Sequence, residues 1–513
     1  MNKIDLYIVN EFYLYRKFAI VSTYKKLAGD TAIYGISSII GRFLNWWLVP
    51  YYSFIFTPEV YGVVTNLYAM ASFFLVFLAY GMETSYFRYA SKSENPEKVY
   101  STSIFSLFAT SVSFILLAVC FKQDIANLIQ YPDHPEYISW FAVILGIDVF
   151  LNIPFARLRL KNKSVKFAFL KIVNIGFNIG FNIFFLTICP KLVENNPDSI
   201  VTLVYSSDIG VGYVFISNLL ASIITLVMLL PEIFRITLQF DKKLLRQMLI
   251  YGFPILIVGI AGMINQNIDK IMMPYLIPEN QNPMHQVGVY GANYKLAVIM
   301  NMFIQAFSYA FEPFFFSRGN TKDDPKVYAT VMKYFAIFGL LIFLGMVLYI
   351  DFVKVIIDKQ YHEGLKVVPL VLMANLFFGI YYALSLWYKL TDKTRYGAYI
   401  AIIGSGITLV LNFLLIPFMG YMGSAIAGLV CFFVMMVISY IYGQKYYPIP
   451  YDLKRIGNYF ITAIFIYILS TFLSQQAIFI KLSVNSALLA CFVFYVFYLE
   501  KTELKSLFKS TKA

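Results

Sequence analysis

Long apolar runs follow one another along almost the whole of this 513-residue chain. A transmembrane helix needs about 20 predominantly apolar residues, and fourteen segments come close to that length, in a pattern of six, six and two. The pattern predicts an all-α polytopic membrane protein with fourteen transmembrane helices. The predicted spans are residues 31–56, 61–81, 100–121, 137–156, 167–188, 210–230, 248–274, 289–311, 330–350, 367–388, 397–417, 421–442, 459–473 and 477–499.

Two stretches of the sequence, one in each group of six spans, carry the same landmarks in the same order. Each has a Val-Tyr-Gly triplet followed by a glutamate 23 positions after the valine, from Val60 to Glu83 and from Val289 to Glu312. Long internal repeats in so apolar a chain are typical of transporters. We therefore expect two pseudo-symmetric lobes and a transport function.

The spans divide the chain into four parts. Residues 1–26 mix charged and aromatic side chains, which predicts a segment at the membrane interface and not a signal peptide. We expect an N-lobe of six helices over 27–240 and a C-lobe of six over 241–443. The last two helices and a tail occupy 444–513.

The composition agrees with a membrane protein, because 59% of the residues are hydrophobic, 13% are charged and the mean hydropathy is +0.68. Soluble domains carry roughly a quarter charged residues. The net charge of +13 does not indicate nucleic acid, because the basic residues sort by loop. The two terminal segments and alternate loops hold 31 of them, and the opposite loops hold six. Positive residues stay on the cytoplasmic side, so we expect both termini there.

The sequence does not contain the residue patterns that indicate common enzyme sites. The four cysteines, Cys120, Cys189, Cys431 and Cys491, show no metal-ligand spacing, and the chain has neither a phosphate-binding loop nor a His-Glu-x-x-His site. The predicted external loops are short, whereas enzymes that act outside the membrane build their sites on larger ones. We expect no cofactor, no metal and no catalytic residue.

Four basic residues fall inside predicted spans. Lys171 is close to the end of its span, from which its side chain can reach the interface. Arg42 lies 11 residues into the first span, about 16 Å along a helix, where an unpaired charge costs several kcal/mol. Lys270 and Lys295 lie four and six residues inside the outer edges of the seventh and eighth spans, so Lys295 is the deeper of the two.

Two carboxylates are candidate partners for these cations. Asp148 lies near the middle of the fourth span, and Asp269 precedes Lys270 but points about 100° away around a helix. In one interpretation Arg42 and Asp148 form a buried structural pair. In the other, Arg42 and Lys295 line a hydrated cavity that attracts a phosphate group, with Lys270 at its mouth. Asp148 is also a candidate protonatable coupling site.

Helix-breaking residues in the first and seventh spans are candidate hinges. Bending there would open and close a cavity. These residues are Gly41, Pro50, Pro254, Gly259 and Gly262.

Three stretches carry a family resemblance: Gly35–Arg88, the Asp269-Lys270 pair followed by Val289-Tyr290-Gly291, and 412–417 (Asn-Phe-Leu-Leu-Ile-Pro) with Gly420, Gly423 and Ala425. They resemble the polysaccharide-exporter branch of the multidrug/oligosaccharidyl-lipid/polysaccharide (MOP) flippase superfamily, often called Wzx-type or O-antigen flippases. The resemblance covers nearly the whole chain.

The resemblance implies two six-helix lobes around a central cavity, as in MATE transporters, with two further helices at the C-terminus. It implies movement of an undecaprenyl-diphosphate-linked oligosaccharide from the cytoplasmic to the outer leaflet of a bacterial inner membrane. Such units build lipopolysaccharide O-antigen, capsule or exopolysaccharide, alongside polysaccharide assembly proteins. Family cavities are lined by basic residues, a role that the resemblance carries to Arg42 and Lys295.

Two alternatives stay open. A lipid II flippase, which handles the peptidoglycan precursor, has the same number of spans. A membrane polymerase or ligase acting on the same lipid-linked sugars would carry a large external loop with catalytic side chains.

Overall fold

The computed structural model describes residues 39–234, 239–318, 324–473 and 476–510. Over these residues the chain is helical, and no β-strand occurs among them. Eleven helical segments of the described part are long and apolar enough to cross a membrane. The chain is therefore a multi-pass helical membrane protein. The interfacial segment predicted for residues 1–26 lies outside the described residues.

Helices also lie at the three remaining predicted spans, although they are shorter or less apolar than the eleven. They are the helix over residues 39–55, the α11–α12 pair (Pro283–Leu296 and Val298–Arg318) and α19 (Leu453–Thr471). The eighth predicted span is thus interrupted at Ala297, between α11 and α12. The number of fourteen transmembrane helices stays a prediction.

Contacts within the chain divide it into two compact units. The first holds the described residues up to Leu48 together with Phe74–Leu256, and the second holds Val49–Phe73 with the described residues from Ile257 onward. Three helices contribute residues to both units: the helix over 39–55, α2 (Pro58–Ala79) and α10 (Lys242–Leu276). The lobe boundaries expected at 240 and 443 stay a prediction.

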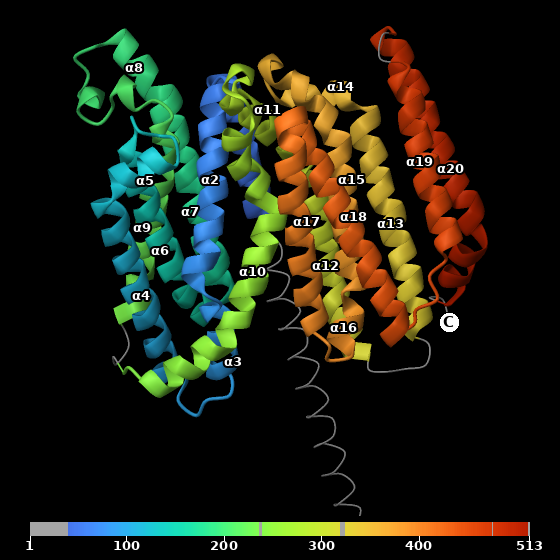
Figure 1. The fold of residues 1–513 in the computed structure, drawn as a ribbon, viewed down its shortest axis with the longest axis horizontal. Helices are drawn as coiled ribbons and strands as arrows, with labels where there is room; N and C mark the ends of the chain where they lie inside the picture. Colours follow the sequence, from blue (N-terminus) through green and yellow to red (C-terminus); the bar gives the residue numbers. More distant parts are fainter. Residues whose placement is uncertain (1–38, 235–238, 319–323, 474–475, 511–513) are drawn as a thin grey trace, which may run out of the picture. The chain divides into compact units, whose positions relative to one another are not determined.

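The other elements of the first unit follow in sequence order (Figure 1). They are α3 (Met82–Ala90), α4 (Pro96–Cys120), α5 (Lys122–Leu128), α6 (Pro135–Leu160), α7 (Ser164–Ile183), the π-helical turn η1 (Phe184–Ile188), α8 (Cys189–Asn195), the 3₁₀ turns η2 (Ile200–Leu203) and η3 (Ser207–Ile209), and α9 (Gly212–Phe234).

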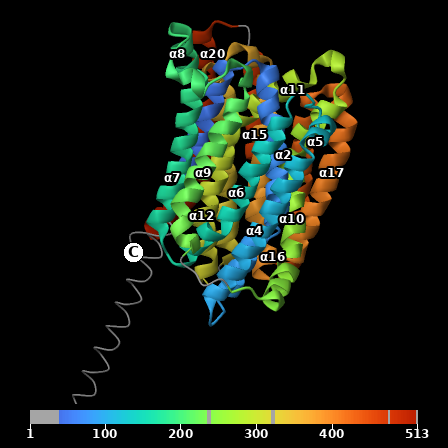
Figure 2. The ribbon, with the colours of Figure 1, turned by 90° about the vertical axis from the view of Figure 1, so that its left-hand side faces the viewer.

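The core of the first unit lies between α4, α6, α7 and α9, which pack on one another in sequence-distant pairs. Figures 1 and 2 show these helices side by side. Proline at the first position of α4 and of α6 fixes a backbone angle suited to a helix start. Leu151, Phe155 and Leu158 of α6 then pack against Leu170 of α7 and Leu229 of α9.

The second unit contains the following further elements, also labelled where space allows in Figure 1. They are η4 (Glu279–Gln281), α13 (Asp324–Leu348), α14 (Ile350–Val353), η5 (Lys354–Ile356), η6 (Lys359–Val367), α15 (Val368–Leu384), α16 (Leu386–Leu390), α17 (Arg395–Met419), α18 (Tyr421–Tyr446) and α20 (Ile478–Ser510). The helix α18 packs on both α15 and α17, and α19 packs on α13 and α20.

The glycines of the repeated Val-Tyr-Gly triplets both allow a close helix crossing in the second unit. A Cβ added at Gly62 would collide with the carbonyl oxygen of Met284, and one added at Gly291 would collide with the side chain of Thr65. The helices α2 and α11 therefore cross with only glycine between their backbones, which any larger residue would prevent. This crossing brings α2, α10 and α11 together around the charged residues of the second unit.

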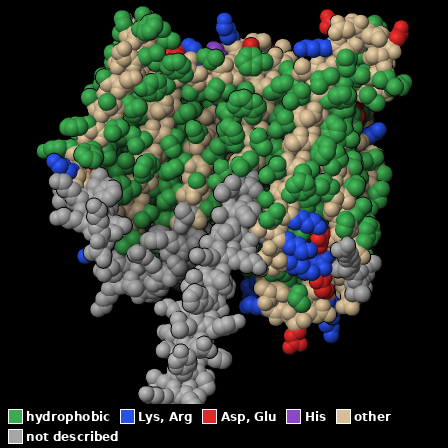
Figure 3. Space-filling view, turned by 180° about the vertical axis from the view of Figure 1, so that it is seen from behind, with side chains coloured by type: hydrophobic (Ala, Val, Ile, Leu, Met, Phe, Trp, Pro, Cys, Tyr) green, Lys and Arg blue, Asp and Glu red, His purple; other side chains and the backbone are tan. Residues whose placement is uncertain are grey.

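The surface of the described part matches a bilayer environment. Figure 3 shows hydrophobic side chains spread over a broad area of one face, and lysine, arginine, aspartate and glutamate side chains gathered toward its upper and lower margins. Large apolar residues such as Phe418, Phe479 and Phe494 are exposed. Contact of these side chains with water is unfavourable, whereas contact with lipid is favourable.

Candidate functional site

A buried ion pair lies on α10 within the second unit. Lys270 and Asp269 are consecutive, and helix geometry separates their Cβ directions by about 100°. Their side chains meet all the same, because the lysine Nζ curls back to 2.9 Å from the Asp269 Oδ1 and 3.1 Å from the Gln266 carbonyl oxygen. The exposed fractions are only 6% for Lys270 and 8% for Asp269. Each charge thus has its partner within one helical turn.

Neighbouring helices complete the surroundings of this pair. Tyr290 of α11 donates its hydroxyl hydrogen to Asp269 Oδ2 over 2.8 Å. The ammonium of Lys270 lies 4.2 Å from the ring centroid of Tyr294 and 5.3 Å from that of Tyr290, within the range of cation–π attraction. From α2, the Asn66 side-chain amide donates to the Lys270 carbonyl oxygen over 2.8 Å. Three helices therefore fix one acid–base pair.

Lys295 adds a second cation close to this pair. It occupies the last turn of α11, just before the interruption at Ala297, and its side chain is exposed. It lies near enough to Lys270 for their positive charges to repel one another. Asp269 is paired with Lys270, so the cluster holds one more cation than it holds carboxylates. We refer to Asn66, Asp269, Lys270, Tyr290, Tyr294 and Lys295 as the α10–α11 cluster.

Arg42 belongs to the first unit. It lies on the helix over 39–55, next to Gly41, where an added Cβ would come within 2.8 Å of Ile175 on α7. The Arg42 side chain is exposed and makes no hydrogen bond or ion pair with any residue that the structure describes.

The residues that interact with Asp148 come from α7 and α9. Its Oδ1 accepts a hydrogen bond of 2.8 Å from Ser222 Oγ on α9, and Lys171 of α7 is the cation that attracts it. Lys171 lies 4.2 Å from the Phe155 ring centroid and is exposed. No contact between Asp148 and Arg42 occurs among the described residues, so whether those two act as a pair stays a prediction.

The candidate hinge residues lie inside helices. Pro50 lies inside the helix over 39–55, and Pro254, Gly259 and Gly262 lie inside α10, which continues from Lys242 to Leu276. An added Cβ at Gly262 would meet open space. A bending role for these residues stays a prediction.

A network of ion pairs holds one end of the first unit together. Arg157 is buried, lies 4.3 Å from the Tyr100 ring centroid and binds Glu97 over 2.5 Å. In the sequence, this arginine is only one of the 31 basic residues of the terminal segments and alternate loops. The further pairs are Arg159 with Glu83, Lys161 with Glu97, and both Lys163 and Lys166 with Glu232.

The loop before α10 carries a related pair. Asp241 Oδ2 lies 2.7 Å from Lys98 Nζ, and Asp241 also accepts hydrogen bonds from the backbone amides of Lys243 and Leu244. The hydrogen bond from Lys98, together with those amides, lowers the pKa of Asp241 from 3.8 to about 2.

Among the described residues no group of three or more histidine, cysteine, aspartate or glutamate side chains is placed to hold a metal ion. The charged groups described above form ion pairs, with exposed cations beside them, and cations of this kind can bind an anion.

Comparison with known proteins places the sequence and the fold. Residues 27–318 match the family model described as polysaccharide biosynthesis protein. No curated protein matches the chain.

Three solved structures illustrate the likeness in fold. An inward closed structure of the lipid II flippase MurJ covers 91% of this chain and 99% of its own, with 15% identity and a TM-score of 0.65. An inward-facing multidrug resistance MATE family transporter of the MOP superfamily covers 83% of this chain and 95% of its own, with 13% identity and a TM-score of 0.60. A MOP superfamily transporter from Pyrococcus furiosus Vc1 covers 81% and 95%, with 12% identity and a TM-score of 0.52.

Proposed function

The chain belongs to the polysaccharide biosynthesis protein family, and from this membership we propose that it is a flippase for lipid-linked oligosaccharides. Its substrate is an oligosaccharide unit on undecaprenyl diphosphate, which it moves from the cytoplasmic to the outer leaflet of a bacterial inner membrane. The unit serves a surface polysaccharide such as O-antigen, capsule or exopolysaccharide. Both termini are on the cytoplasmic side.

The α10–α11 cluster is the observation that carries this proposal. A diphosphate cannot cross hydrocarbon unless cations and water replace its solvation. Lys295 supplies an exposed cation beside a pair whose own charges are already balanced. Tyr290 and Asn66 hold that pair in place from neighbouring helices, and Lys295 meets the diphosphate beside it. Arg42 supplies a second exposed cation from the first unit.

The transport cycle follows from the proposed architecture. Two six-helix lobes, with two further helices at the C-terminus, alternate between openings to either side of the membrane. Bending near Gly41 and Pro50, and near Pro254, Gly259 and Gly262, accompanies the change. The prenyl tail remains in lipid while the sugars pass along a hydrated path across the membrane.

A lipid II flippase is the second candidate, and the likeness in fold to MurJ favours it. The sequence family favours the oligosaccharide flippase, because its description refers to polysaccharide biosynthesis. A polymerase or ligase is disfavoured, because the solved structures that share this fold are a flippase and transporters.

Deletion of the gene in its host separates these candidates. We expect complete prenyl-linked repeat units to accumulate on the cytoplasmic face, surface polysaccharide to be lost and growth to continue. A block in cell-wall synthesis would identify a lipid II flippase instead. Single units on the outer face would identify a polymerase or ligase and would contradict transport.

Substitutions at Lys295 test the α10–α11 cluster in the same cells. We expect Lys295→Ala to lower surface polysaccharide at least tenfold at equal protein level, because the diphosphate loses its cation. Lys295→Arg keeps the charge and retains most activity. Lys359→Ala removes an exposed lysine in η6 and is the matched control. Full activity of Lys295→Ala would show that the cluster does not bind the substrate.

A further inference from the structure

An apolar groove lies within the second unit, at a distance along the chain from the α10–α11 cluster. Its cavity measures about 400 Å³ and is formed by α13, α15, α18 and α19. The groove exists because α19 packs on α13 and α20 while touching α15 mainly through the ring stack of Phe460 on Phe377, whose centroids are 5.8 Å apart. The exposed Phe433 and Leu453 border it.

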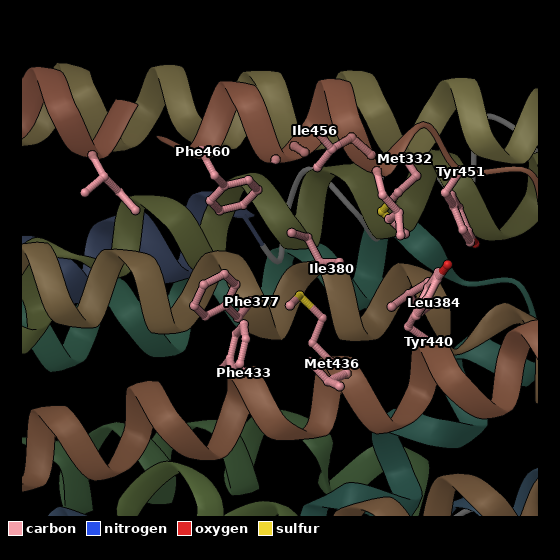
Figure 4. A pocket seen from close by; sticks show the side chains of 15 residues that line it. Met332, Phe377, Ile380, Leu384, Phe433, Met436, Tyr440, Tyr451, Ile456 and Phe460 are labelled. Atoms are coloured by element: carbon pink, nitrogen blue, oxygen red, sulfur yellow. The ribbon is translucent and has the colours of Figure 1, made fainter. Parts of the chain in front are cut away.

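The groove has two chemically different ends. Figure 4 shows Phe377, Phe433 and Phe460 toward one end and Tyr440 and Tyr451 toward the other, where their hydroxyl groups lie. The remaining lining is almost wholly hydrocarbon and sulfur. An apolar cavity of this kind does not hold water. At roughly 30 Å³ for a water-sized group, it has room for about a dozen such groups, which is a large part of one acyl chain.

A polar pocket of about 300 Å³ adjoins the tyrosine end of the groove. Lys326, Thr330 and Lys333 of α13 line it together with Asp452 and Arg455 at the start of α19. The two cavities use neighbouring residues of the same two helices, since Met332 of α13 and Leu453 and Ile456 of α19 line the groove. A cationic pocket and an apolar groove therefore meet at the junction of α13 and α19.

Buried charges fix the wall of the polar pocket. Glu500 of α20 has no exposed surface, and its carboxylate lies 2.6 Å from Lys333 Nζ, 2.6 Å from the Tyr459 hydroxyl and 3.6 Å from the Arg455 guanidinium. These contacts hold Lys333 and Arg455 at the pocket. Lys326 is exposed at its rim. Glu500 pairs with Lys333, and Asp452 pairs with Arg455 over 3.1 Å. The three cations of the pocket therefore exceed these two carboxylates by one charge, which Lys326 carries at the rim, so the pocket attracts an anion.

We propose that this junction binds a membrane phospholipid, with its phosphate in the pocket lined by Lys326, Lys333 and Arg455 and one acyl chain in the groove. Charge complementarity specifies the phosphate, and the apolar lining specifies the chain. The groove has room for one acyl chain. The bound lipid ties α19 and α20 to the rest of the second unit.

Filling the groove tests the acyl-chain half of the proposal. A Cβ added at Gly457, which lines the groove on α19, would meet nothing within 4 Å. Gly457→Phe therefore occupies the groove without a backbone collision. Gly406 on α17 is exposed, has equally open surroundings and lies outside the groove, so Gly406→Phe is the matched control.

The measurement is the phospholipid that remains on the full-length protein after purification in detergent, identified and counted by mass spectrometry of the extracted lipid. We expect the wild type and Gly406→Phe to retain phospholipid, and Gly457→Phe to retain at least fivefold less. Equal retention by Gly457→Phe would overturn the proposal. A prenyl phosphate in place of phospholipid would also overturn it and would assign the groove to the transport substrate.

Substitution of the rim lysine tests the headgroup half. In vesicles of phosphatidylglycerol and phosphatidylcholine, we expect the wild type to enrich phosphatidylglycerol at its surface, measured as quenching by a spin-labelled lipid. Lys326→Gln lowers this preference at least twofold, whereas Lys454→Gln, an exposed lysine that does not line the pocket, leaves it unchanged. An equal preference in both variants would exclude a headgroup site at this pocket. None of these readouts depends on transport, so a failure of the proposed lipid site can be distinguished from a failure of the proposed function.

Discussion

Each unit of this protein places a lysine and an aspartate inside a predicted span, and the two units treat them differently. In the second unit, Asp269 and Lys270 are buried and in contact, and Tyr290 satisfies the other carboxylate oxygen. In the first unit, Asp148 is held by Ser222, while Lys171 attracts it without an ion-pair contact. We call Asp269 and Lys270 the closed pair, because their side chains are in contact. We call Asp148 and Lys171 the open pair, because their side chains are not.

This difference between the two pairs indicates which charges are available to bind a ligand. A buried pair with every partner in place contributes rigidity, and separating its members leaves an uncompensated charge. Lys270 therefore helps to fix the packing of the residues around it. Its expected position at the mouth of a cavity stays a prediction. Lys295 and Arg42 are exposed, so an anion can reach them, and the proposal that they bind the substrate concerns these two cations.

Removing the acid of the closed pair gives the largest expected effect. Asp269→Ala leaves Lys270 buried without its carboxylate, and loss of one partner of a buried ion pair costs about 3–5 kcal/mol. We expect a marked fall in the thermal midpoint of the purified protein. Unfolding in detergent, followed by fluorescence, measures it.

The double variant Asp269→Leu with Lys270→Met is the control for this prediction. It removes both charges and keeps their approximate volume, so the unfolding free energy returns to within about 1–2 kcal/mol of the wild type. A double variant as unstable as Asp269→Ala would show that packing, and not the charge, accounts for the loss.

The open pair predicts a smaller effect. In Asp148→Asn the amide oxygen still accepts the hydrogen bond from Ser222, and only the attraction to Lys171 is lost. Because the two side chains make no ion-pair contact, we expect the loss of unfolding free energy to be smaller than that of Asp269→Ala. A loss as large as that of Asp269→Ala would mean that Asp148 is as closely paired as Asp269, and the comparison between the units would fail.

Much of the helical architecture could be predicted from hydropathy, because lipid requires continuous apolar helices. The family resemblance is confirmed by the match over residues 27–318. The interruption at Ala297 was missed, since the residues around it are as apolar as a continuous span. The purpose of Gly62 and Gly291 was also missed. The repeat drew attention to them, but the crossing of α2 and α11 is visible only in three dimensions.

The charged residues of the site could be identified from the sequence, but their partners could not. Lys171 was assigned to the interface from its position near a span end, yet it lies beside Asp148. Asp269 and Lys270 were expected to diverge, and a flexible lysine side chain overcame the offset. Asn66 and Tyr290 come from distant parts of the chain. Their roles depend on helix packing, for which a single sequence carries no direct signal.

An exposed pair in the first unit gives the smallest expected effect and extends the comparison to the surface. Lys98 and the backbone amides lower the pKa of Asp241 from 3.8 to about 2, so its stabilising contribution is full above pH 3.8 and disappears as the pH falls through about 2. We expect Asp241→Ala to melt slightly below the wild type at pH 5 to 7 and at the same temperature near pH 2. Melting curves of both proteins across this range measure the difference. A difference that persists unchanged at pH 2 would mean that Asp241 acts through its packing and not through its charge.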